Sequence, residues 1–234
     1  MNGYLTLILT GHVPYLRAAG REPGGEDRLH ETIADAIVPT LNALYDLREL
    51  GLRPYVGLAY SPVLIEQLAD NVVQKHFFVW MNRRIERLAE AVAQWEREGE
   101  PHRSYLGRFY LEWSRGILDS FTDRYNRNLV AALRELCVEG LAEPLSSAAT
   151  HAYLPLLHRA ESQRAQIDVG ALAITHQMGV RARGCGYPNV ATRPRSRRCC
   201  GQAACHYPDR RLPSASVAHQ CAAPAAALAG GAAG

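Results

Sequence analysis

The 234-residue sequence predicts an α/β fold built on a parallel sheet, either open or closed into a barrel. Short apolar runs suited to buried strands alternate with longer segments in which apolar residues recur at helical spacing. Polar clusters follow the strand candidates, at the strand ends where parallel α/β folds place their ligands. The composition changes near Gly170, so we expect the fold to occupy residues 1–170.

The first expected unit is a strand, a helix and a second strand. Residues 4–10 form a short run rich in Leu, Ile and Thr, which suits a buried parallel strand. Residues 29–47 carry apolar side chains at helical spacing. Within them Pro39 predicts a kink or a helix restart, and Gly51 predicts the end of the helix. Residues 54–60 are predicted to form the second buried strand.

Long helices are expected after the second strand. Ser61 and Pro62 form a good helix start, because a hydroxyl can cap the first turn and proline suits the first helical position. Two long amphipathic segments follow, one with apolar positions from 73 to 92 and one from 113 to 136, and a polar connector at 96–103 joins them. Their aromatic residues are expected in the core, namely Phe77, Trp80, Trp113 and Phe121.

A third unit completes the expected fold. Residues 145–150 are small and form a third strand candidate. Residues 156–169 again show helical spacing. Strands that alternate with helices in this way favour a parallel sheet.

The sequence after Gly170 has a different character. From Ala171 onward it contains eight Arg, no Lys and Asp209 as its one acid, which leaves 18 basic and 22 acidic residues before it. The front is therefore about −4 and the tail about +7, so the net basic charge does not predict a nucleic-acid partner. The tail shows no sustained period and ends in Ala and Gly. We expect residues 171–234 to be disordered.

Two features bear on the compartment. Cys137 is the one cysteine before the tail, which argues against a disulfide-stapled secreted protein. The first residues lack a basic region, and the apolar run at 5–9 is too short for a signal peptide or a membrane span. We therefore expect a cytoplasmic protein with no membrane partner. The sequence makes no prediction of an oligomeric state.

Polar side chains follow each of the three predicted strands. The clusters are residues 10–15, 60–62 and 150–155. His12, Tyr15, His151 and Tyr153 could converge there on one polar ligand. Imidazole and phenol suit sugar hydroxyls, because they offer directed hydrogen bonds and an aromatic face. The alternative is that the two histidines only cap loop backbone.

Two of these clusters carry a family resemblance. Residues 12–17, His-Val-Pro-Tyr-Leu-Arg, are similar to the motif H-x-H-x-P-Y-x-R of glycoside hydrolase family 57, with Thr10 in place of the first His. Residues 149–157, Ala-Thr-His-Ala-Tyr-Leu-Pro-Leu-Leu, resemble its motif A-T-H-G-Y/F-L-P-L-L. Weaker likeness lies at 29–47, 61–70 and 164–167. Residues 3–170 thus resemble the amino-terminal part of the family, particularly its 1,4-α-glucan branching enzymes.

The resemblance implies a (β/α)7 barrel of which residues 1–170 are the incomplete front. It also implies a retaining reaction on α-1,4-glucans such as glycogen and amylose, with two carboxyl groups about 5 Å apart and no metal or cofactor. His12 and His151 match family histidines that line the subsite for the sugar under attack, with Tyr15 and Tyr153 as further substrate contacts. The change to Thr10 argues against full activity. Amylase and 4-α-glucanotransferase remain open, and Trp80 could stack on glucan.

The family's nucleophile is a Glu in a motif W-[I/L]-P-E-C-[A/G]-Y, expected near Pro188 and Asn189. Residues 184–194 are instead Gly-Cys-Gly-Tyr-Pro-Asn-Val-Ala-Thr-Arg-Pro. With permitted codons, reading them from the third base of the first codon gives V-W-I-P-E-C-G-Y-T-P. We therefore predict a frameshift between about Gly170 and Arg181. The chain would then be a truncated, inactive product that lacks the nucleophile and the acid/base and has uncovered strand edges.

Other interpretations remain. A non-catalytic glucan-binding or scaffold protein would also retain His12 and His151. A metal-dependent polysaccharide deacetylase-like barrel would need an Asp with paired His, and the sequence has no evident set. In the tail, Cys199, Cys200, Cys205 and His206 could bind zinc, but their spacing matches no standard site. The tail arginines could contact phosphate, although a solvated run is favoured.

Overall fold

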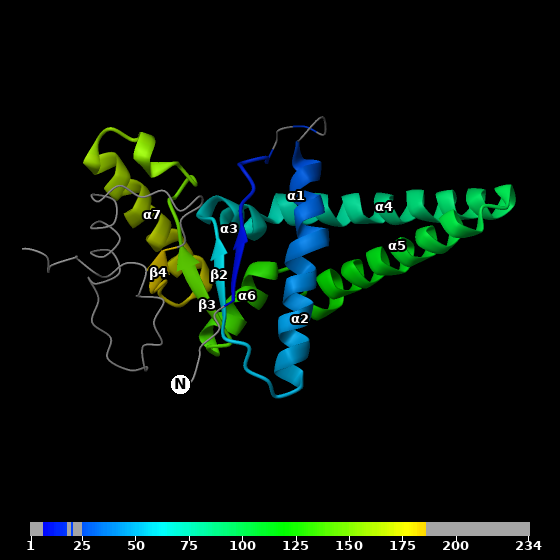
Figure 1. Ribbon diagram of the computed structural model, residues 1–234, viewed down its shortest axis with the longest axis horizontal. Coiled ribbons are helices and arrows are strands. Elements are labelled where there is room, and N and C mark those ends of the chain that lie inside the picture. The colour runs from blue at the N-terminus through cyan, green and yellow to red at the C-terminus, as the bar shows by residue number, and fades with distance from the viewer. Residues whose placement is uncertain (1–6, 18–19, 21–24, 186–234) are drawn as a thin grey trace, which may run out of the picture.

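A parallel sheet whose strands follow chain order organises the fold. The computed structural model describes residues 7–17, 20 and 25–185. Within them β1 (Ile8–Gly11), β2 (Val56–Tyr60), β3 (Ala142–Ser146) and β4 (Gly184–Cys185) lie side by side in that order, and every pairing is parallel (Figure 1). Because crossovers between parallel strands are right-handed, this order carries the helices over one face of the sheet, as in a barrel. The predicted α/β class is confirmed.

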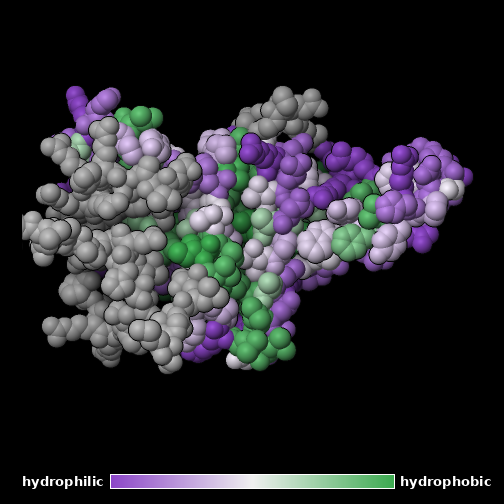
Figure 2. Space-filling view, viewed as in Figure 1, coloured by the Kyte–Doolittle hydropathy of each residue, from purple (hydrophilic) through white to green (hydrophobic). Residues whose placement is uncertain are grey.

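The first two strands are close to their predicted positions. The strand expected at 4–10 is β1, which ends one residue later, and residues 4–6 lie outside the described residues. The strand expected at 54–60 begins at Val56, because Tyr55 has a φ of 47° and cannot continue an extended strand. β1 is an edge of the described sheet, and Leu7 and Ile8 are 57% and 41% exposed there. Figure 2 shows apolar surface where Figure 1 places β1.

The helix between these strands changes its winding midway. α1 (Glu26–Thr32) continues into a π-helical turn (Ile33–Ile37) and then into α2 (Val38–Glu49). Pro39 follows the π-helical turn inside an unbroken helix, because Ile37 and Val38 keep right-handed helical backbone angles. The helix therefore does not restart at Pro39, and the interruption predicted there takes the form of the π-helical turn before it. Gly51 follows the helix with a φ of 74°, and the Leu52 amide donates to the carbonyl of Leu47 at 2.9 Å, which confirms the predicted end.

A helical hairpin extends away from the sheet. After α3 (Pro62–Ala69), the helices α4 (Asn71–Glu98) and α5 (Pro101–Asp119) run antiparallel as a long arm (Figure 1). The predicted connector at 96–103 is wrong in extent, since Gly99 and Glu100 alone separate the two helices. Gly99 ends α4 with a φ of 71° and Pro101 starts α5. Glu96 stays helical and pairs with Arg108 across the hairpin.

The second predicted amphipathic segment is two helices. α5 ends in a π-helical turn (Ser120–Arg124), and α6 (Leu129–Val138) starts anew after it. Asn126 and Arg127 have φ values of 46° and 60°, and these left-handed residues turn the chain back to the sheet. Phe77 and Phe121 meet in the core with ring centroids 4.8 Å apart, as expected, and Trp80 lies partly buried beside Phe77. Trp113 is 41% exposed on the arm, contrary to expectation.

The last described elements extend beyond the predicted boundary. β3 begins three residues before the predicted 145–150, and residues 147–150 form a loop. A short 3-10 turn (Leu154–Leu156) precedes α7 (Ala160–Met178), which runs through Gly170 to its end at Gly179, where φ is 67°. The structure thus places residues 171–185 in the fold, in place of the disordered tail expected from Ala171. Residues 186–234 lie outside the described residues.

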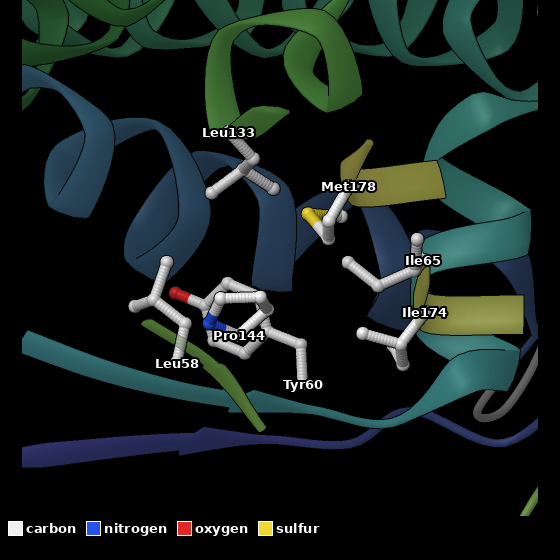
Figure 3. A pocket seen from close by; sticks show the side chains of 7 residues that line it. All are labelled: Leu58, Tyr60, Ile65, Leu133, Pro144, Ile174 and Met178. Carbon is white, nitrogen blue, oxygen red and sulfur yellow. The ribbon is translucent and has the colours of Figure 1, made fainter. Parts of the chain in front are cut away.

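The C-terminal part of α7 packs into the core. Ile174 and Met178 of α7 are 2% and 3% exposed. Figure 3 shows them beside Ile65 of α3 and Leu133 of α6, facing Leu58, Tyr60 and Pro144 of the sheet. The space that these seven side chains enclose is about 10 Å³, which is close to the size of one water molecule. It is a small packing gap in the core and is too small for a sugar.

No helix in the described part of the chain has both the length and the apolar character needed to cross a bilayer.

Candidate functional site

A backbone hydrogen bond and a close side-chain contact hold the carboxyl ends of β1 and β2 together. Beyond the last strand pair, Gly11 opposite Tyr60, the Ser61 amide donates to the Gly11 carbonyl at 2.9 Å. A Cβ on Gly11 would lie 2.8 Å from the Tyr60 ring, so a larger residue would push this contact apart. The chain therefore leaves β1 directly beside the start of α3, and His12 comes next to Ser61.

The loop after β3 is positioned by α7. Gly170 is needed because a Cβ there would lie 2.0 Å from the Ser147 carbonyl oxygen. The Ala149 amide donates to the Gln166 carbonyl at 2.8 Å, and the Thr150 amide donates to Gln166 Oε1 at 3.0 Å. The loop thus rests on one side of α7, and two residues of that helix fix its course.

His151 stands in a strained conformation at the end of this loop. Its φ is 56°, in the left-handed region that non-glycine residues rarely adopt. The His151 amide donates to the Ala148 carbonyl at 2.8 Å, which closes a turn. Such strain costs on the order of 1 kcal/mol and is often found at functional sites, where surrounding contacts maintain it.

The two loops bring the two predicted histidines into contact. The imidazole rings of His12 and His151 stack with centroids 3.7 Å apart and planes 7° from parallel. His12 Nδ1 lies 2.9 Å from the Ser61 hydroxyl oxygen. Residues far apart in the sequence thus form one flat pair at the carboxyl ends of β1 and β3, the edge where parallel folds bind ligands.

Both imidazoles favour the neutral form. The pKa of His12 is lowered from its usual 6.5, first because its ring is withdrawn from water and second because His151 lies against it. The pKa of His151 is lowered by burial. Two stacked imidazolium ions would repel each other, so the observed contact suits two uncharged rings. A neutral imidazole offers one donor and one acceptor, which matches a sugar hydroxyl.

The two predicted tyrosines lie apart from the histidine pair. Tyr15 is 64% exposed and Tyr153 is 43% exposed, and neither ring stacks with the histidines among the described residues. Tyr15 instead interacts with Arg17, whose pKa is raised by a hydrogen bond with Tyr15 and by Asp70. The structure thus brings together two of the four predicted side chains and leaves both tyrosines at the surface.

Two glutamines that the sequence did not single out position the site. Gln67 of α3 is buried, and its amide group bonds to the Leu16 amide at 2.7 Å and to the Pro14 carbonyl at 3.0 Å. It therefore holds the loop that follows His12, as Gln166 holds the loop that precedes His151. Each glutamine is an uncharged polar residue in a helix that follows a strand-end cluster, and this placement is the signal that could have found them.

A groove of about 410 Å³ opens beside His12, between the ends of β1 and β2 and the helix before β2. Its lining is mixed apolar and polar, made of Leu9, Thr10, Gly11, His12, Thr32, Ala36, Ile37, Thr40 and Tyr60. The π-helical turn contributes Ala36 and Ile37. Burial raises the pKa of Tyr60, so this phenol stays neutral. The groove is large enough for part of a sugar chain.

No group of three or more His, Cys, Asp or Glu side chains in the described ranges is arranged to hold a metal ion. The possible zinc ligands Cys199, Cys200, Cys205 and His206, and the expected nucleophile position near Pro188 and Asn189, all lie outside these ranges.

Comparison with known proteins gives consistent family matches. The profile described as Glycosyl hydrolase family 57 matches residues 6–207. A 1,4-alpha-glucan branching enzyme of Thermococcus kodakarensis is 36% identical over 194 residues, which are 83% of this chain and 28% of that protein. A probable 1,4-alpha-glucan branching enzyme of Mycobacterium tuberculosis is 28% identical over 79% of this chain and 38% of its own length.

Solved structures give the same result. The GH57-type branching enzyme of Pyrococcus horikoshii superimposes with a TM-score of 0.77 at 36% identity, covering 83% of this chain and 36% of that one. The α-amylase AmyC of Thermotoga maritima gives a TM-score of 0.77 at 25% identity, covering 87% and 39%. This chain thus spans a little over a third of these structures and 28% of the first curated relative.

The lowered pKa values predict a pH dependence of stability. Between the lowered folded values and 6.5, the unfolded chain binds more protons than the folded chain. The contribution of the histidine pair to the free energy of unfolding is therefore complete above about pH 6.5 and is lost as the pH falls below that value.

Urea unfolding at pH 7.5 and at pH 5.5 measures this effect. Between these two pH values, the free energy of unfolding should decrease less for a His12→Phe/His151→Phe variant, which retains two stacked rings, than for the unmodified chain. His102→Asn, at an exposed position on the arm, should leave the drop unchanged. An equal drop in all three proteins would contradict the prediction.

Proposed function

We propose that this chain, which belongs to glycosyl hydrolase family 57, carries the glucosyl-binding side of a 1,4-α-glucan branching enzyme site. The stacked pair of His12 and His151 is the observation that supports this most directly. Its flat, uncharged surface lies at the ligand-binding edge of the sheet, beside a groove of about 410 Å³. The two rings offer hydrogen bonds to the hydroxyls of one glucosyl unit, and the groove accepts neighbouring units of an α-1,4-glucan such as glycogen or amylose.

The groove fits this role in its chemistry. Thr10 and Thr40 add hydroxyl groups and Tyr60 adds an aromatic face, which are the partners that a neutral sugar uses. The groove lining contains no carboxylate. This part of the site therefore binds and orients the glucan, and the acidic groups of a retaining reaction must come from other strands.

Sequence similarity favours branching over the other family activities. The branching enzymes of Thermococcus and Pyrococcus are both 36% identical to this chain, and the Thermotoga amylase is 25% identical. On that ranking we assign the site to a glucan-branching enzyme, of which this chain carries the binding part. Cys137, a free thiol buried in the core, supports a location in the reducing cytoplasm.

The structure supports a frameshift that lies later in the chain than the predicted range 170–181. α7 runs to Met178 with Ile167, Ile174 and Met178 buried, and Ala182 is 7% exposed in the hydrophobic core. Gly184 then pairs with Leu145 as β4 begins. A chain that packs this well up to Gly184 is best explained by an intact frame to that point. We place the shift at the Gly184 codon.

The genetic code supports the same position. From Cys185 to Thr192 the amino acids fix the first two bases of every codon. In the shifted frame these pairs, TG, GG, TA, CC, AA, GT, GC and AC, each complete one codon of V-W-I-P-E-C-G-Y. The glutamate of this reading takes the position of Asn189, shortly beyond β4.

The first experiment tests glucan binding. Maltoheptaose should bind the purified chain saturably, and His151→Ala should weaken binding roughly tenfold or more, because it removes one ring of the pair and one hydrogen bond to the sugar. Isothermal titration at pH 7.5 measures this. His158→Ala, which removes an exposed histidine seven residues later, is the matched control and should bind like the unmodified chain. Equal binding by both variants would overturn the assignment.

The second experiment tests the reading frame. The DNA of codons 184–192 should encode V-W-I-P-E-C-G-Y from the third base of the Gly184 codon, and the purified chain should not branch amylose in an iodine-spectrum assay. Third bases that spell another peptide would refute the frameshift. Branching activity of the chain would refute its inactivity. Glucan binding without the hidden motif would favour the alternative of a non-catalytic glucan-binding protein.

A further inference from the structure

The Ser61 hydroxyl interacts with two elements, the first turn of α3 and the His12 ring. Its hydroxyl oxygen accepts the Leu64 amide at 3.3 Å, which caps α3, and the same oxygen lies 2.9 Å from His12 Nδ1. Ser61 is fully buried, with 0% of its surface exposed. Its backbone amide is also held, by the Gly11 carbonyl at 2.9 Å. The position of this hydroxyl is therefore fixed from both directions.

Among the described residues, the hydroxyl hydrogen of Ser61 has one acceptor. A hydroxyl accepts through two lone pairs and donates one hydrogen. Once the oxygen accepts the Leu64 amide, its own hydrogen needs a partner, and among the described residues His12 Nδ1 is the acceptor within reach. If His12 Nδ1 donated instead, the hydroxyl hydrogen would be buried with no acceptor among these residues, which is unfavourable because a buried donor loses its bond to water without replacement.

We propose that Ser61 is a positioning residue that sets the tautomer of His12. The hydroxyl donates to Nδ1, so the neutral ring carries its hydrogen on Nε2. Nε2 makes no hydrogen bond with the described residues, so it is available to a ligand as a donor. His12 thus presents N–H to a sugar oxygen, such as a glycosidic, ring or hydroxyl oxygen. This role rests on the proposed glucan site for its purpose, whereas the tautomer itself can be measured without a glucan.

The stack with His151 holds the His12 ring in one orientation, so the tautomer decides which group the ring presents to a ligand. His151 covers one face of the His12 ring, at a centroid distance of 3.7 Å, and Ser61 occupies its Nδ1 edge. The ring cannot flip to exchange its nitrogens without breaking both contacts. A single ring orientation with a single tautomer gives a fixed donor, and fixed donors lose little conformational entropy on binding.

The test compares three variants by NMR of imidazole nitrogens at pH 8, where both histidines are neutral. Ser61→Gly removes the hydroxyl but keeps most of the cap, because glycine is tolerated at a helix N-cap. Ser61→Thr retains a hydroxyl. Asn128→Ala removes the cap of α6, whose side chain accepts the Ala131 amide at 3.0 Å, and controls for loss of a helix cap.

In the unmodified chain, Nδ1 of His12 should give the signal of an unprotonated nitrogen and Nε2 that of a protonated one. Ser61→Gly should give a mixture and bind maltoheptaose roughly threefold to tenfold more weakly, the effect of about one hydrogen bond. Ser61→Thr and Asn128→Ala should both keep the original pattern. A protonated Nδ1 in the unmodified chain, or an unchanged pattern in Ser61→Gly, would overturn the proposal. The expected tautomer with no maltoheptaose binding would retain Ser61's role and refute the glucan assignment.

Discussion

The contact of α7 with the loop after β3 is the constraint on which the site depends. At Gly170 the helix approaches the Ser147 carbonyl so closely that no side chain fits between them. One turn earlier, Gln166 bonds to the amides of Ala149 and Thr150. These contacts force the chain into the turn that leaves His151 with a left-handed backbone. The stack with His12 follows from that turn, because β1 and β2 place His12 independently.

Much of the fold was predictable from the sequence, because its signals are local. The caps at Ser61 and Gly51 act within one turn of the chain, and both appear as predicted. The predictions were wrong where contacts between residues distant in the sequence determine the structure. Gly170 looked like a boundary because the charge changes after it, but the glycine is required for helix packing. Trp113 looked like core on its helix face, but the arm extends beyond the core.

The candidate site was predicted in part for the same reason. His12 and His151 each follow a strand, and parallel topology brings such positions together. Tyr15 and Tyr153 follow the same strands by a few more residues, far enough for the loops to carry them to the surface. Ser61, Gln67 and Gln166 hold the histidine loops through contacts between separate elements. The position of each glutamine in the helix after a strand-end cluster marks it as a candidate, but the partner that it bonds to depends on how separate elements pack.

If His12 and His151 form one surface that binds glucan, an NMR titration of the chain with maltoheptaose should show it at the ring protons of the histidines and the other aromatic residues. We expect the signals of His12 and His151 to shift together and to saturate at the same glucan concentration, while those of His102 and His158 stay in place. Shifts confined to the exposed aromatic residues of α5, with the signals of both site histidines unchanged, would show that glucan binds elsewhere.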